Sequence, residues 1–182
     1  DPAPSPVVAD ALAGVPGVRV VHAAFADLDA IMDVEQRAYP IPWTRLNFAD
    51  ILAHPAQYAI QLLWDERLPD APPSLIGYFV VMQGVQEAHL LNIAVHPDYQ
   101  GQGWSVFLLR QLCYWALWHQ ARQVWLEVRT SNPHAHRVYE RFGVRAVGRR
   151  KNYYPAVGGG REDAIVMCCM LDAPSDSSLD GC

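Results

Sequence analysis

The chain has 182 residues, of which 51% are apolar and 18% charged, so it suits one globular domain with a substantial core and is not a disordered chain. A formal net charge of −5 argues against a general nucleic-acid binder, and no apolar run is long enough to cross a bilayer. The four cysteines form no C-x-x-C pair, and the histidines suggest no metal-ligand set. We therefore expect a cytoplasmic protein without a nucleic-acid, membrane or metal partner.

The first half of the chain predicts two short helices among strands. A weakly alternating run over 18–23 predicts the first strand. Asp27 is expected to cap a helix that reaches Ala38, and Thr44 to cap a short helix that ends before Pro55. Three apolar runs bounded by Gly, Pro or Asp then predict an antiparallel meander of strands. They span 58–64, 75–83 and 87–95.

The next segments predict a helix over 104–121 and a strand over 123–129. The strand alternates, with apolar residues on one face and Glu127 on the other. Asn132 is expected to cap a helix that ends at Gly143, a typical residue just beyond a helix end.

A strand near 145–149, a loop over 151–163 and a final strand over 164–171 are expected to complete the chain. We interpret the basic cluster at 149–151 as part of a solvated loop. This order of elements predicts an α+β fold with a central mixed, largely antiparallel sheet flanked by helices. The domain is expected over 18–172. A flexible arm over 1–17 and a flexible tail over 173–182 are expected outside it.

A glycine-rich turn, HPDYQGQGWS over 96–105, stands between an apolar strand and an apolar helix. Such a turn binds phosphate, because its bare backbone N–H groups lie at the positive end of the helix dipole. A Walker A loop is excluded because Trp104, and not Lys, follows Gly103. A dinucleotide fingerprint is excluded because Val106 stands where its third glycine is needed.

A third pattern, Gln/Arg-x-x-Gly-x-Gly/Ala, is the coenzyme A loop of the GNAT superfamily of N-acetyltransferases. Gln100, Gly103 and Ser105 resemble it, with Ser in the last place. Three blocks in order, LLNIAVHPDYQGQG, VWLEVRTSNPHAHRVYERFGV and RRKNYYPAVGGGREDAIVM, resemble one branch of that superfamily, the ribosomal-protein-alanine N-acetyltransferases. The resemblance is close from about 86 to 171.

That resemblance implies a single GNAT-type domain whose sheet is splayed at the acetyl-CoA site. It implies acetyl transfer from acetyl-CoA to the α-amino group of an N-terminal alanine. The implied acceptor is a ribosomal protein, small-subunit protein eighteen. Acetylation of lysine side chains or small amines by the same fold, and a non-catalytic module that binds CoA or a peptide, remain as alternatives.

The resemblance assigns Glu127 as the catalytic base and Tyr139 as the catalytic acid. A peptide α-amine has a pKa of about 8, so near neutral pH a base must take its proton before it can attack. A phenol with a pKa near 10 can donate a proton to the departing thiolate. The simpler alternatives are a strand Glu127 paired with Arg129, and a Tyr139 that packs beside Val138 and Phe142.

The resemblance also assigns cofactor and acceptor contacts. Main-chain groups at 93–95 would pair with the pantetheine arm, and the turn at 101–106 would hold the pyrophosphate. A buried strand, a helix cap at Asn132 and a core role for Trp104 are the simpler explanations. The implied cofactor residues are Ile93, Ala94, Val95, Gly101, Gln102, Gly103, Trp104, Ser105, Val106 and Asn132. The implied walls of the peptide cleft are Tyr39, Trp43, Asn152, Tyr153 and Tyr154, and covering of a domain edge is their alternative.

Overall fold

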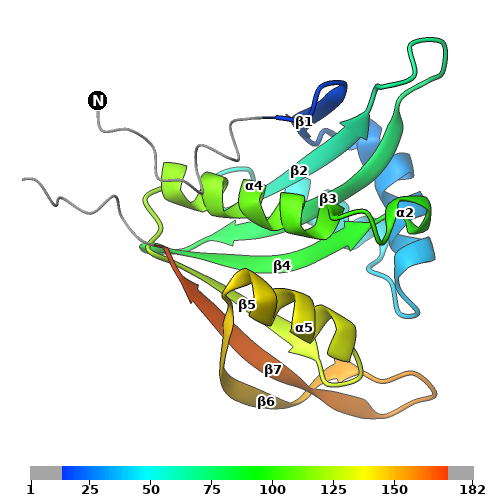
Figure 1. The fold of residues 1–182 in the computed structure, drawn as a ribbon. Coiled ribbons are helices and arrows are strands. Elements are labelled where there is room, and N and C mark those ends of the chain that lie inside the picture. The colour runs from blue at the N-terminus through cyan, green and yellow to red at the C-terminus, as the bar shows by residue number, and fades with distance from the viewer. Residues whose placement is uncertain (1–13, 172–182) are drawn as a thin grey trace, which may run out of the picture.

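The computed structural model describes residues 14–171, which form one seven-stranded mixed sheet with helices on both faces (Figure 1). The α+β prediction is confirmed. Of the arm expected over 1–17, only 14–17 lie within the described residues, and the tail expected over 173–182 lies outside them.

The strand order across the sheet is β1-β2-β3-β4-β5-β7-β6. The first four strands pair antiparallel in sequence order, so the predicted meander is confirmed. β4 and β5 are parallel, and β7 lies antiparallel between β5 and β6. The bounds are β1 Val18–His22, β2 Tyr58–Asp65, β3 Ser74–Gln83, β4 Glu87–Val95, β5 Gln123–Arg129, β6 Arg145–Pro155 and β7 Arg161–Met170.

Two of the three predicted helix caps are confirmed. Thr44 accepts a hydrogen bond from the Asn47 backbone N–H at 3.2 Å, and Asn132 caps its helix in the same way. Asp27 does not cap, because its carboxylate turns back to accept from the Ala24 N–H at 2.8 Å. The helices are η1 Phe25–Asp27, α2 Leu28–Ala38, α3 Arg45–Leu52, η2 Pro97–Tyr99, α4 Trp104–Trp118 and α5 Pro133–Phe142.

The expected loop over 151–163 is wrong, because most of it is a β-hairpin. β6 continues to Pro155 and β7 begins at Arg161, so only 156–160 turn. The interpretation of 149–151 as a solvated loop is half right: the three residues are exposed, but they lie in strand β6. Arg149 donates to the Asp163 carboxylate at 3.3 Å, and the next residue of β6 forms an ion pair described below.

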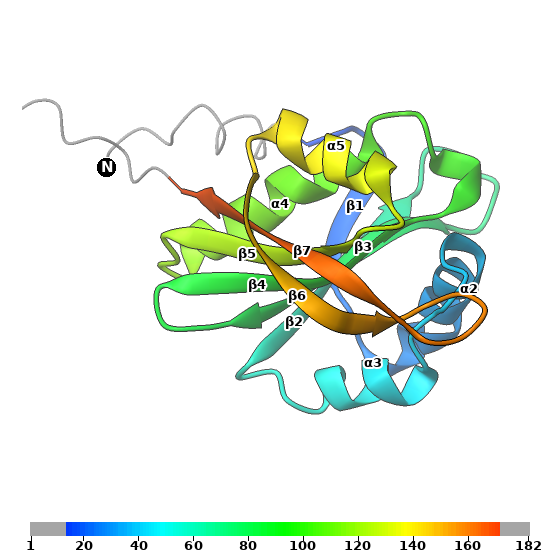
Figure 2. The ribbon, with the colours of Figure 1, turned by 90° about the horizontal axis from the view of Figure 1, so that it is seen from below.

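The sheet separates two apolar layers (Figures 1 and 2). α4 and α5 cover one face, and α2 and α3 cover the other over β2 to β4. Trp104 is buried in the α4 layer, in agreement with the core role expected for it. Within residues 14–171 no helix is long and apolar enough to span a membrane.

The parallel pairing of β4 with β5 stops after Leu90 and Leu126, and beyond that point the two strands separate. Figure 1 shows their ribbons close at one end and apart at the other. The β3–β4 register shifts at the same place, where Leu91 is one extra residue in β4. The splayed sheet that the resemblance implied is therefore present, and it leaves one edge of 91–95 without a neighbouring strand.

Gly77 sets how closely β3 approaches the separated part of β4. A Cβ at this position would lie 2.3 Å from the Ala94 carbonyl oxygen and 3.2 Å from a Leu108 methyl. We expect Gly77→Ala to lower the free energy of unfolding by about 1–3 kcal/mol, as overpacking does. Gly148→Ala is the matched control, because no atom lies within 4 Å of its Cβ position. Urea titrations that gave both variants the same midpoint would contradict this account.

Candidate functional site

A cavity of about 370 Å³ opens where β4 and β5 separate, and we call it the gap cavity. It is lined by residues from α2 and the segment after it, from both strands, from α5 and from the end of β6. Among the residues expected at the site, it brings together Tyr39, Trp43, Ile93, Glu127, Asn132, Tyr139 and Tyr154.

Glu127 lies on β5 with its side chain 6% exposed. One carboxylate oxygen is hydrogen-bonded to His89 Nε2, and the other lies 3.2 Å from Arg150 Nε. The alternative pairing with Arg129 is wrong, because Arg129 instead pairs with Glu162 at 2.8 Å. The carboxylate is thus held from two sides, and a cation already balances its charge.

Tyr139 lies on α5 and is 8% exposed. Burial raises the pKa of its phenol to about 12, because the charged form is poorly solvated there. The side chain also packs in the α4 layer, close to Val138 and Phe142, so the packing role is present as well. The phenol keeps its proton at neutral pH and can serve as a donor in the cavity.

Three aromatic side chains form further walls of the gap cavity. Tyr154 donates to the Glu127 backbone oxygen at 3.2 Å, and the Arg129 guanidinium lies 4.3 Å from its ring centre. Tyr39 donates its hydroxyl to a backbone oxygen of β4, and Trp43 packs against the buried Phe48 beneath it. Burial is the main cause that raises the pKa of both tyrosines, so both are donors.

Asn152 and Tyr153 do not line the gap cavity. Both lie on β6, where the Asn152 backbone has φ of 51° and its N–H donates to Asp163 at 3.0 Å. Tyr153 is 40% exposed and packs edge-on against Tyr154 with ring centres 4.8 Å apart. From this segment the structure brings only Tyr154 and Pro155 into the cavity.

Along the separated part of β4, the backbone groups of successive residues point alternately to β3 and into the gap. His96 N–H donates to the Ile76 oxygen of β3 at 2.7 Å, so Ala94, two residues earlier, also directs its backbone groups to β3. Ile93 and Val95 therefore direct theirs into the gap. Their carbonyls have partners there: the Tyr39 hydroxyl donates to Ile93, and a side chain at 3.2 Å to Val95. Two of the three expected residues thus direct their backbone groups into the gap.

The glycine turn ends at the first turn of α4. Gly101 and Gly103 have φ of 75° and 88°, in the left-handed region that glycine adopts without strain. No side chain caps α4, so the N–H groups of its first turn are not taken by a cap. Trp104, Ser105 and Val106 supply those N–H groups, which lie at the positive end of the helix dipole.

The side chains of Gln102 and Trp104 are hydrogen-bonded to each other beside this turn. The Trp104 indole N–H donates to the Gln102 amide oxygen at 3.2 Å, and the Gln102 amide donates to the Asp98 backbone oxygen at 3.4 Å. Both side chains therefore stabilise the turn itself.

Four polar residues at this site are not expected from the sequence: Glu35, His89, Asn92 and Arg150. For two of them, the sequence contains a signal that could have identified them. Glu35 stands four residues after Ile31 on the apolar stripe of α2, and Asn92 is a polar residue inside the apolar run of β4. The residues over 14–171 contain no group of three or more His, Cys, Asp or Glu side chains placed to hold a metal.

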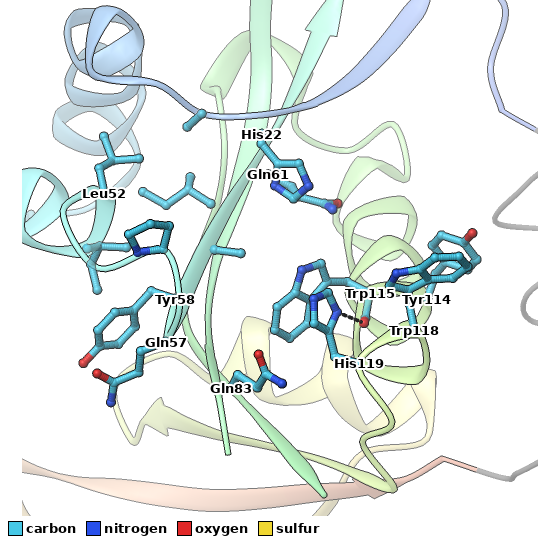
Figure 3. A pocket seen from close by; sticks show the side chains of 15 residues that line it. His22, Leu52, Gln57, Tyr58, Gln61, Gln83, Tyr114, Trp115, Trp118 and His119 are labelled. Atoms are coloured by element: carbon cyan, nitrogen blue, oxygen red, sulfur yellow. Dashed lines mark hydrogen bonds between the residues drawn. The ribbon is translucent and has the colours of Figure 1, made fainter. Parts of the chain in front are cut away.

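A second cavity, of about 510 Å³, lies beside β2 between the ends of α3 and α4. Figure 3 shows Trp115, Trp118 and His119 on its α4 side and Leu52 and Tyr58 across from them. None of the residues expected at the functional site lines it. The residues expected at the functional site thus do not meet in this second cavity.

The splayed sheet and the glycine turn agree with a family match. The sequence model of the acetyltransferase (GNAT) family matches residues 28–144. The chain belongs to this family and is an acetyl-CoA-dependent N-acetyltransferase.

Two relatives and one solved structure show which members of the family this chain is similar to. The ribosomal protein bS18-alanine N-acetyltransferase of Haemophilus influenzae is 36% identical over 145 residues, covering 80% of this chain and 93% of the relative. The Escherichia coli protein of that name is 39% identical over 142 residues, covering 78% and 89%. The crystal structure of the ribosomal-protein-S18-alanine N-acetyltransferase from Escherichia coli superposes with a TM-score of 0.74 at 32% identity, covering 88% and 97%.

The raised pKa of Tyr139 predicts how stability changes in alkali. The unfolded phenol ionises near pH 10, whereas the folded one holds its proton to about pH 12, so the stabilisation is present below pH 10 and is lost as the pH rises between these values. We expect Tyr139→Phe to remove part of this decline, about 2 kcal/mol between pH 10 and 12. Urea unfolding at several alkaline pH values measures it, and identical slopes for both proteins would contradict the assignment.

Proposed function

We propose that this protein acetylates the α-amino group of an N-terminal alanine of a ribosomal protein, by direct transfer from acetyl-CoA. One observation carries the proposal: the gap cavity brings the Glu127 carboxylate and the Tyr139 phenol beside the open edge of β4. The relatives that align with this chain over most of their length bear names that describe this reaction.

The residues present fit acetyl-CoA. The N–H groups at the start of α4, after two glycines in the left-handed conformation, suit a pyrophosphate. The gap-facing backbone groups of Ile93 and Val95 suit the amides of a pantetheine arm. Ser105 stands where the family pattern has Gly or Ala. It follows the turn directly, and we propose that its hydroxyl donates a hydrogen bond to a phosphate oxygen.

In the proposed reaction Glu127 takes a proton from the acceptor ammonium, which frees the nitrogen lone pair. The nitrogen attacks the thioester carbonyl, and the C–S bond breaks to give the amide and the CoA thiolate. Tyr139 donates its proton to that thiolate, and the second proton that leaves the acceptor nitrogen as the amide forms restores the phenol. An ionised carboxylate has about four acceptor positions, so the contacts of Glu127 with His89 and Arg150 leave room for the acceptor proton.

The acceptor preference can be tested with peptides and acetyl-CoA, followed by mass spectrometry. We expect acetylation of the free N-terminus of peptides that begin with Ala followed by a basic residue. Peptides with a blocked N-terminus and a free Lys are the controls, and we expect no product from them. Acetyl groups found only on Lys would overturn the proposed acceptor. CoA binding without turnover on any amine would instead support a non-catalytic module.

Glu127→Gln tests the proposed base. We expect turnover to fall by about a hundredfold or more at pH 7, and by less at pH 9. The reason is that an α-amine with a pKa of about 8 loses its proton to solvent at the higher pH. Glu87→Gln, which removes a strand carboxylate outside the cavity, is the control. A rate profile like that of the wild type would exclude Glu127 as the base.

A further inference from the structure

Glu35 is a second carboxylate in the gap cavity, and the reaction proposed above does not use it. It lies on α2 and is 1% exposed, which is rare for a Glu unless it has partners. Its position four residues after Ile31 directs it with the apolar face of the helix into the domain. An ionised side chain so placed needs hydrogen bonds to offset its lost hydration.

Those hydrogen bonds come from three separate parts of the chain. The Trp43 backbone N–H donates to one carboxylate oxygen at 3.0 Å, and the Asn92 amide donates to each oxygen at 3.1 Å. The Tyr78 hydroxyl of β3 donates to the second oxygen. One side chain therefore ties α2 to the segment that carries Trp43, to β3 and to the separated end of β4.

The two carboxylates of the cavity differ in how their charge is balanced. Glu127 has a guanidinium, Arg150, at 3.2 Å. The hydrogen-bond partners of Glu35 are neutral donors, namely an amide, a backbone N–H and a hydroxyl. Burial raises the pKa of Glu35, and the hydrogen bonds from these three groups oppose that rise by favouring the charged form.

We propose that Glu35 is a positioning residue that sets acceptor specificity: its carboxylate holds the Trp43 wall against β4 and supplies the negative charge that favours a protonated amine in the cavity. This role rests on the proposed function only in that the acceptor binds in the gap cavity. The partner chemistry is a primary ammonium group at the end of a peptide. Binding of acetyl-CoA should be insensitive to this charge, since the groups proposed to hold it on β4 and at the glycine turn are neutral backbone groups.

Steady-state kinetics of Glu35→Gln, with Asp33→Asn as the matched control, tests this role. Asp33 is on the same helix with an exposed carboxylate outside the gap cavity. We expect Glu35→Gln to raise the KM for an Ala-initial peptide about tenfold and to leave the KM for acetyl-CoA within about twofold. Asp33→Asn should change neither. An unchanged peptide KM, or an equal rise in both KM values, would overturn the proposal.

A second measurement separates charge from bracing. A peptide analogue with a hydroxyl in place of the α-amine serves as a neutral inhibitor of the wild type, Glu35→Gln and Asn92→Ala. We expect the wild type and Asn92→Ala, which both keep the carboxylate, to bind the amine more tightly than the hydroxyl. Glu35→Gln should lose most of this preference. A preference retained in full by Glu35→Gln would overturn the charge role.

Calorimetric CoA binding and thermal melting show whether each variant is folded. If Glu35→Gln does not fold, the preference for the amine is still measured on the wild type and on Asn92→Ala. Wild-type protein with no preference for the amine over the hydroxyl would also overturn the proposal. Should the wild type acetylate only Lys side chains, the proposed acceptor fails, but the same comparison with a Lys peptide still decides the role of Glu35.

Discussion

The separation of β4 from β5 after four paired residues is the constraint on which the site depends. A strand edge inside a domain costs free energy, because backbone N–H and C=O groups lose water without gaining a partner. Here the cost is reduced locally, since the Tyr39 hydroxyl and the Gln100 amide donate to two of the exposed carbonyls. The remaining donors of that edge are the ones the proposed cofactor site would use, so that site coincides with the place where strand pairing ends.

Two buried carboxylates, Glu127 and Glu35, lie beside the gap. Glu127 sits on β5 at the point of separation and reaches His89 of β4 and Arg150 of β6, so it depends on strands on both sides of the gap. Glu35 enters from α2 and is satisfied by neutral donors from the segment after α2, from β3 and from β4. A cavity in which one carboxylate pairs with a guanidinium and the other is bonded to neutral donors favours cations, which suits the ammonium form of the proposed acceptor.

Much of the fold could be predicted from local patterns, because the meander and the caps at Thr44 and Asn132 follow from strand runs and side-chain chemistry. The β6–β7 hairpin could not. KNYYP and GGRED lack alternation, and their strand character comes from pairing such as Tyr154 with Glu162. The partners of Glu127 were equally hidden: its neighbour in sequence, Arg129, turns to Glu162, while the real partners are set by strand order.

The site residues came largely from a resemblance between sequences, and the alternation of β4 shows what such a resemblance leaves undecided. It named 93–95 together, but a strand directs the backbone groups of successive residues to opposite sides. The bond from His96 to Ile76 gives the Ala94 groups to β3, and only Ile93 and Val95 face the gap. The extra residue Leu91 changes the β3–β4 register just before this segment. The bulge that accompanies the separation of the strands thus also bears on which backbone groups the cofactor meets.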